Sequence, residues 1–108
     1  MTNAKSEFLS HVDFVQTKVK CAVIKPWILD DDTKVYNRFK FTLPCNYSPE
    51  QYSEFLNLME FEYDDTMDEQ MIFGTIWFDD DSWSARDGPY DSDWWVHHRV
   101  PPIPENLK

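Results

Sequence analysis

The chain has 108 residues, enough for one globular domain with a single core and too few for two. Hydrophobic residues make up 42% of it and aromatic residues 17%, which excludes an acidic disordered chain, because such chains are poor in aromatic side chains. Twenty acidic residues against ten Lys and Arg give a net charge of −10, which argues against direct binding to nucleic acid or to anionic membranes and favours encounter with basic partners.

The N-terminal residues give no sign of a targeting segment. Met1–Phe14 carries polar residues at intervals and lacks the apolar run of a signal peptide, and no stretch approaches the ~20 apolar residues of a membrane span. Cys21 and Cys45 are too few for a disulfide framework, so we expect reduced, mostly buried thiols. These features predict a cytoplasmic protein.

The first half of the chain predicts a helix followed by a β-hairpin. Ser6–Phe14 is expected to form a short helix, with a frayed leading segment as the alternative. Val19–Trp27 is typical of a strand, and Pro26 is expected at its end or at a sheet edge because proline has no amide donor. After an acidic turn, Lys34–Leu43 alternates like a half-buried strand. Its predicted inner face consists of Val35, Phe39, Phe41 and Leu43.

The best-defined element is a helix from Pro49 to about Phe61. Ser48 is a typical N-cap residue, Pro49 suits the first helical position, and Gln51 occupies the capping-box position. One apolar stripe follows at helical spacing, made of Tyr52, Phe55, Leu56 and Met59. We interpret this stripe as the side that packs on the core.

The second half predicts another hairpin. Met71–Phe78 is apolar at nearly every position, which is typical of a strand buried on both faces. Asp79–Asp81 forms the expected turn, Ser82–Arg86 the returning strand, and Trp94–Val100 a final short strand. The three prolines and one isoleucine of the 101–104 tail are expected to be extended.

Together these elements predict a single α+β domain over residues 1–108. The expected arrangement is ββ-α-ββ, with one main helix packed on one face of a mainly antiparallel sheet of four to five strands. The short N-terminal helix would be an addition to this unit.

Acidic side chains concentrate in the second half of the chain. Between Glu60 and Asp93, Arg86 is the only basic residue. Three interpretations stand: a solvated surface, a recognition surface for a basic protein in which carboxylates replace nucleic-acid phosphates, and a metal site. For the second, the predicted partner-binding residues are Asp64, Asp65, Asp68, Glu69, Asp79, Asp80, Asp81, Trp83, Asp87, Asp91, Asp93, Trp94 and Trp95.

Four tryptophans crowd into the same region. We expect Trp77 and one member of the Trp94–Trp95 pair in the core, while an exposed member of Trp83, Trp94 and Trp95 would anchor a partner's Arg or Lys. The alternative is that all four complete a small core.

Metal binding and catalysis receive little support from the motifs. Asp91-Ser92-Asp93 is a DxD triplet, but Gly88 stands in the wrong place for a calcium loop. His97 and His98 point to opposite faces of a strand, and His97 could pair with Asp91 or Asp93 without a positioned nucleophile. We therefore predict no enzymatic activity, no cofactor and no metal.

The C-terminal half also carries a resemblance. The segments Phe73–Trp83, Asp87–Trp95 and Pro101–Pro104 resemble small acidic proteins of tailed bacteriophages. This resemblance implies a phage protein made in the host cytoplasm, and it carries no assigned catalytic or binding residue. Proteins of this size and charge commonly inhibit host machinery with basic nucleic-acid channels.

The leading functional hypothesis is a non-enzymatic, phage-type inhibitor or modulator of a basic host protein such as a nuclease, a restriction or CRISPR component, or a polymerase. An immunity-type protein that neutralises one toxin is the alternative among binding proteins. A small metal-dependent enzyme and a virion assembly component are the alternatives from other classes. The sequence leaves the partner and the oligomeric state open.

Overall fold

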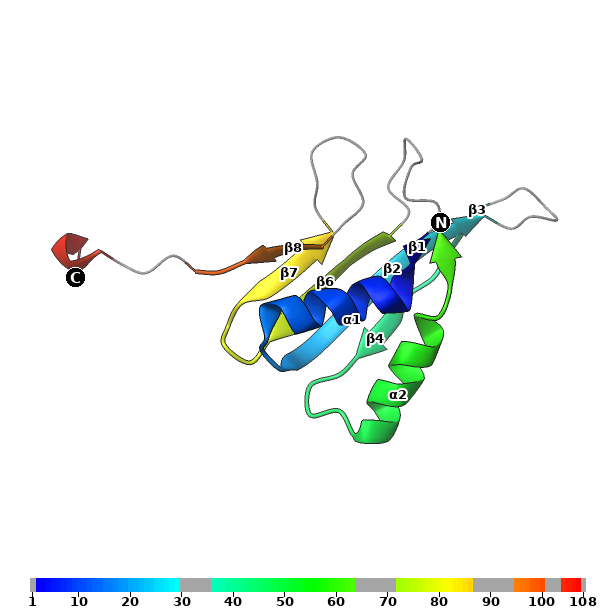
Figure 1. Cartoon of the computed structure of the whole chain (residues 1–108), viewed down its shortest axis with the longest axis horizontal. Helices are drawn as coiled ribbons and strands as arrows, with labels where there is room; N and C mark the ends of the chain where they lie inside the picture. Colours follow the sequence, from blue (N-terminus) through cyan, green and yellow to red (C-terminus); the bar gives the residue numbers. More distant parts are fainter. Residues whose placement is uncertain (1, 30–35, 64–71, 87–94, 101–103, 108) are drawn as a thin grey trace.

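The computed structural model describes residues 2–29, 36–63, 72–86, 95–100 and 104–107, and it confirms the predicted α+β class (Figure 1). The helices are α1 (Ala4–Val15) and α2 (Pro49–Leu58), with a short 3₁₀ helix, η1 (Glu105–Leu107). The strands are β1 (Thr2–Asn3), β2 (Val19–Leu29), β3 (Tyr36–Arg38), β4 (Phe41–Leu43), β5 (Glu62–Tyr63), β6 (Ile72–Phe78), β7 (Trp83–Arg86) and β8 (Trp95–His98).

The main sheet has six strands, one more than the upper end of the prediction. Its order is β3-β2-β6-β7-β8, and β4 pairs with β2 on the same side as β3. Every strand pair in the described ranges is antiparallel. Strands β2 and β6 form the centre and pair from Val19 opposite Phe78 to Pro26 opposite Ile72, with a register shift between Val19 and Cys21. Strands β1 and β5 pair separately as a two-stranded sheet.

Pro26 lies within β2, a central strand, so the expectation that it marks the strand's end or an edge is wrong. Within an antiparallel strand, the N–H and C=O groups of one residue point toward the same neighbouring strand. The carbonyl of Pro26 accepts a hydrogen bond from the Phe39 amide at 3.0 Å. The missing donor of Pro26 therefore faces the break between β3 and β4. This break divides the predicted Lys34–Leu43 strand, and Phe39, predicted to face inward, is 45% exposed.

Both helices pack against the same face of the sheet, and α1 lies across it in Figure 1. The Asn3 side chain caps α1 by accepting a hydrogen bond from the Ser6 amide at 2.9 Å. Phe8 of α1 and Phe55 of α2 meet edge to face with ring centroids 5.4 Å apart. The core consists of Ala4, Phe8, Val15, Val19, Ala22, Ile24, Leu43, Phe55, Met59, Ile72, Ile76, Phe78 and Trp95.

The predicted capping box of α2 is confirmed. Ser48 Oγ accepts from the Gln51 amide at 3.1 Å, and the Gln51 side chain accepts from the Ser48 amide at 2.8 Å. The apolar stripe faces the core as expected, with Phe55 and Met59 buried. The helix ends at Leu58, three residues before the predicted end at Phe61.

The two thiols differ from the prediction in burial. Cys21 is partly buried and Cys45 is exposed, and both are free. Burial and a hydrogen bond with Cys45 raise the pKa of the Cys21 thiol. Within the described ranges, no helix combines the length and the apolar composition that crossing a membrane requires.

Candidate functional site

The two faces of the sheet differ sharply in burial. Along β6, Ile72, Ile76 and Phe78 are buried under the helices, whereas Phe73 and Trp77 are 44% and 42% exposed. The prediction that β6 is buried on both faces, with Trp77 in the core, is therefore wrong. The physical reason is that α1 and α2 both cover one face, and no described helix covers the other.

We call this uncovered side the open face. Residues opposite each other in register share a face, so its members follow from the strand pairing. None of them is fully buried. On β6, β7, β8 and the part of β2 that pairs with β6, the open face consists of Cys21, Val23, Lys25, Phe73, Thr75, Trp77, Trp83, Ala85, Val96 and His98.

An aromatic row crosses one end of the open face. Trp77 lies opposite Trp83, and Trp83 lies opposite His98. The Trp83 and His98 rings stack, with centroids 5.5 Å apart and an interplanar angle of 19°. Trp83 is half-buried in this stack, whereas Trp77 keeps 42% of its surface in contact with solvent. Trp77 is therefore the accessible indole of the row.

The turn that joins Trp77 to Trp83 contains three aspartates. Asp80 folds back on the turn and accepts hydrogen bonds from the Ser82 amide at 3.0 Å and from the Ser82 hydroxyl. Asp81 has a φ of 66°, a left-handed conformation that aspartate tolerates better than most residues. All three aspartates are exposed. The Asp80 carboxylate is hydrogen-bonded within the turn, whereas Asp79 and Asp81 are held in place through their backbone amides.

Local charge around this turn is mixed. The Ser82 hydroxyl and amide hold the pKa of Asp80 below its usual value, and Arg99 contributes in the same direction. The backbone carbonyl of Lys18 accepts a hydrogen bond from the Asp79 amide at 3.0 Å. Asp79 also borders a shallow cavity of about 230 Å³ shared with Lys18 and Lys20. Carboxylates and ammonium groups are therefore presented side by side at this end of the sheet.

The predicted partner-binding residues divide into three groups. Asp79, Asp80, Asp81 and Trp83 come together at the β6–β7 turn. Trp95 is only 8% exposed, so it cannot be the exposed anchor and is the core member of its pair. The remaining predicted residues lie outside the described part of the chain: Asp64, Asp65, Asp68, Glu69, Asp87, Asp91, Asp93 and Trp94.

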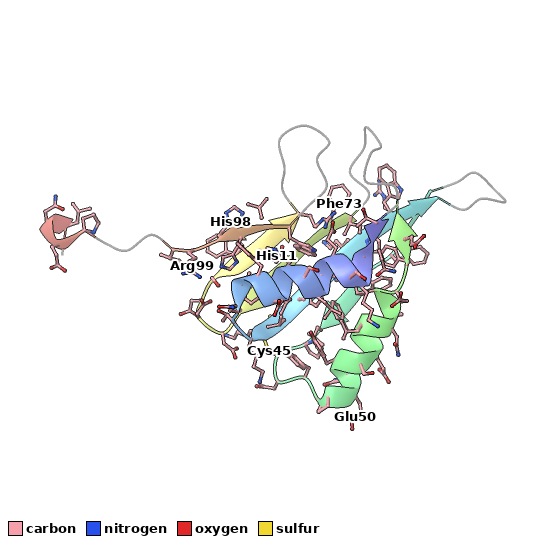
Figure 2. All side chains as sticks on the ribbon, viewed as in Figure 1. His11, Cys45, Glu50, Phe73, His98 and Arg99 are labelled. Atoms are coloured by element: carbon pink, nitrogen blue, oxygen red, sulfur yellow. The ribbon has the colours of Figure 1, made fainter. Side chains whose placement is uncertain are left out.

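Beneath α1 the structure contains a polar network that sequence reasoning missed. Ser84 Oγ lies 2.7 Å from His11 Nε2 and 2.9 Å from His97 Nδ1, so one hydroxyl joins two imidazoles. Figure 2 labels the His11 member of this network on α1. The other ring nitrogen of His97, Nε2, is buried and has no hydrogen-bond partner among the described residues. The helical spacing could have indicated the burial of His11. This residue comes three positions after Phe8 and four before Val15, on the side of α1 that packs on the core.

An ion pair lies next to this network. The Arg86 guanidinium binds the Glu7 carboxylate of α1, and the Arg86 side chain has no exposed area. The guanidinium also lies 5.2 Å from the ring centroid of Trp95, a cation–π distance. Arg86 is therefore a core residue that ties β7 to α1, not a surface charge among the aspartates.

The Ser84 network resembles a nucleophile between two bases, but its burial opposes that role. Ser84 is 0% exposed, so a substrate carbonyl cannot reach its Oγ in this conformation. The predicted pairing of His97 with Asp91 or Asp93 involves residues outside the described ranges. In the described part of the chain, no three His, Cys, Asp or Glu side chains converge to hold a metal ion.

Protonation of the network is expected to make stability depend on pH. Burial, with His97 and Arg86 nearby, lowers the pKa of His11 to about 4, so the folded protein favours the neutral ring while the unfolded chain protonates near 6.5. This stabilisation is present above pH 6.5 and is lost as the pH falls toward 4. Because His11 is partly hydrated, we expect a loss of about 1–2 kcal/mol rather than the full value of the shift.

Urea unfolding of the wild type and of His11→Gln between pH 4 and pH 7 measures this effect. The Gln amide can still reach Ser84 but does not titrate, so the variant should show a flatter dependence over that range. His98→Gln, which removes an imidazole from the open face, is the matched control variant. An identical slope for all three proteins would contradict the role assigned to His11.

Comparison of the chain with protein-family models, with curated proteins and with solved structures finds no match.

Proposed function

We propose that the protein is a non-enzymatic binding protein that recognises a basic segment of another protein through the Trp77 end of the open face. The observation that carries this proposal is the exposed Trp77 indole directly beside the Asp79–Asp81 turn. We call the surface made by Trp77, Trp83, Asp79 and Asp81 the Trp–Asp surface.

The chemistry of the Trp–Asp surface suits an Arg or Lys side chain. An indole face attracts a cation and covers its aliphatic stem, and tryptophan is enriched among the residues that dominate binding energy. Neighbouring carboxylates can accept charge-assisted hydrogen bonds from the same cation. The half-exposed Trp77 also leaves apolar surface in water that a partner would cover.

The net charge supports the same class of partner. A charge of −10 speeds encounter with a basic surface, and the turn then supplies specific contacts. Proteins that handle nucleic acid present such surfaces, because phosphate binding requires Lys and Arg. A nuclease, a restriction or CRISPR component, or a polymerase of a host cell fits this description, in the setting that the resemblance to phage proteins implies.

Two charge-matched variants test whether the site, rather than the net charge, recognises cations. Asp79→Asn with Asp81→Asn removes the free carboxylates of the turn and leaves Asp80, which holds the turn, in place. Asp13→Asn with Glu54→Gln changes the net charge equally at exposed positions on the two helices. An Arg- and Lys-rich peptide should bind the turn variant about tenfold more weakly than the wild type, and the helix variant within about twofold of it.

Calorimetric titration provides the affinities, and circular dichroism verifies that both variants are folded. Equal weakening by the two variants would show that the peptide responds only to net charge. That result would contradict the proposed recognition surface.

A further inference from the structure

A second cleft lies at the other end of the open face, where β3, β2 and β6 meet. Its volume is about 370 Å³, within the range of small-molecule sites. Phe73, which lines the cleft, is four residues before Trp77 on the same strand face, roughly 13 Å away at the usual rise of a strand. The cleft is therefore separate from the Trp–Asp surface, and what it binds is independent of the proposed function.

Aromatic rings form much of the cleft's wall. Phe39 and Phe73 are 45% and 44% exposed, and Trp27 completes the ring-lined part. The Phe39 amide is bonded to the Pro26 carbonyl, so the break between β3 and β4 positions this phenylalanine. Exposed rings held by the backbone of a sheet and its connections offer planar surfaces on which another ring can stack.

Three cations line the same cleft. They are Lys25, Arg38 and Lys40. Arg38 lies directly opposite Trp27 in the strand register, and its guanidinium is 5.3 Å from the centroid of the Trp27 ring. This contact restricts the position of the guanidinium before a ligand binds. No described carboxylate lines the cleft or forms an ion pair with these three side chains.

This grouping is unusual in a chain with twice as many acidic as basic residues. Three of its ten Lys and Arg residues face one aromatic cleft. Like charges gathered without a described counter-charge repel one another, and an anion would relieve that repulsion. Several converging cations favour a phosphate, which carries more charge than a carboxylate and accepts more hydrogen bonds.

We propose that this cleft binds a nucleotide, with the base stacked on the exposed phenylalanines and the phosphate held by Lys25, Arg38 and Lys40. A free mononucleotide is the expected ligand, because the net charge of −10 repels a longer polyanion. A nucleotide within a single strand presents the same chemistry, so the experiment compares the two sources.

Calorimetric titration with AMP, adenosine, inorganic phosphate and a single-stranded oligoadenylate tests this assignment. AMP should bind at least about tenfold more tightly than adenosine or phosphate alone, because only AMP engages both halves of the cleft. Lys25→Gln with Arg38→Gln should weaken AMP binding by about tenfold or more. Lys18→Gln with Lys20→Gln, an equal charge change near the β6–β7 turn, should leave it within about twofold.

Each outcome decides the assignment. Oligoadenylate binding that is tighter than AMP binding, and is lost in the same variant, would identify a strand as the source of the nucleotide. Equal affinity for AMP and adenosine, or equal weakening by both pairs of substitutions, would overturn the proposal. Absence of AMP binding at millimolar concentration would overturn it as well, and would leave the Trp–Asp surface unaffected.

Discussion

Replacing Gly74 by Ala is expected to destabilise the protein by about 2–6 kcal/mol, because the substitution adds backbone strain to a steric clash. Gly74 has a φ of +157°, which L-residues rarely adopt, at the centre of β6. A Cβ atom there would lie 2.5 Å from the Val23 carbonyl oxygen and 3.1 Å from the Ile24 Cα. Neither backbone atom can move without disturbing the β2–β6 pairing that forms the centre of the sheet.

Thermal and urea unfolding of Gly74→Ala measure this loss. A small domain has a total stability of about 5–15 kcal/mol, so the variant should lose a large part of its folded population or unfold far below the wild type. Thr75→Ala is the matched control, since it alters the next residue of the strand without adding an atom. A wild-type unfolding midpoint for Gly74→Ala would show that the close approach of β2 and β6 is wrong.

Glu7→Gln is expected to produce the second large effect, a destabilisation of about 3 kcal/mol. Its carboxylate binds the Arg86 guanidinium, whose side chain has no exposed area. Removing one partner of a buried ion pair costs about 3–5 kcal/mol because the other charge stays buried. We expect the lower end of that range, since the Glu7 side chain is 22% exposed and water reaches it.

A double-mutant cycle isolates this interaction. In Glu7→Gln with Arg86→Met, the buried charge of Arg86 is removed as well, so the double variant should be more stable than the sum of the two single losses predicts. Lys5→Gln is the matched control on α1, because its pair with Glu60 is solvent-exposed and should contribute little. Additive losses in the cycle would contradict the assignment of Arg86 as a buried, paired core residue.

Local signals predicted much of the fold. The Ser48–Gln51 capping box and the stripe through Phe55 and Met59 define α2 because both depend on residues within one or two turns. The strands of the second hairpin were predicted within one residue at each end of β6 and β7, since the Asp79–Asp81 turn separates two strand-forming runs.

The errors arose where a residue's environment depends on distant parts of the chain. A run such as Ile72–Phe78 has apolar residues on both sides, and its sequence does not show which side the helices will cover. Trp77 was therefore assigned to the core although it is exposed. Pro26 was expected at an edge because proline has no amide donor. The break between β3 and β4 tolerates this missing donor, but it is formed by a later part of the chain and cannot be read from the residues around Pro26.

The candidate site was only partly predictable for the same reason. The acidic turn follows from adjacent residues, and its aspartates are exposed as expected. The network of His11, Ser84 and His97 joins residues from a helix and two strands that are far apart in sequence. The cationic cleft likewise combines Lys25, Arg38 and Phe73 from three strands, so no local pattern indicated it.

The most direct test of the proposed binding function is capture of protein partners with three baits. These are the wild type, the Asp79→Asn/Asp81→Asn variant and the charge-matched Asp13→Asn/Glu54→Gln variant, each used at about 0.15 M and about 0.5 M salt, where exposed charge contacts are screened to different extents. We expect that one basic protein binds the wild type and the helix variant at the lower salt, binds the turn variant weakly, and dissociates at the higher salt. Equal capture by both variants, or capture that does not respond to salt, would contradict recognition of a basic partner by the Trp–Asp surface.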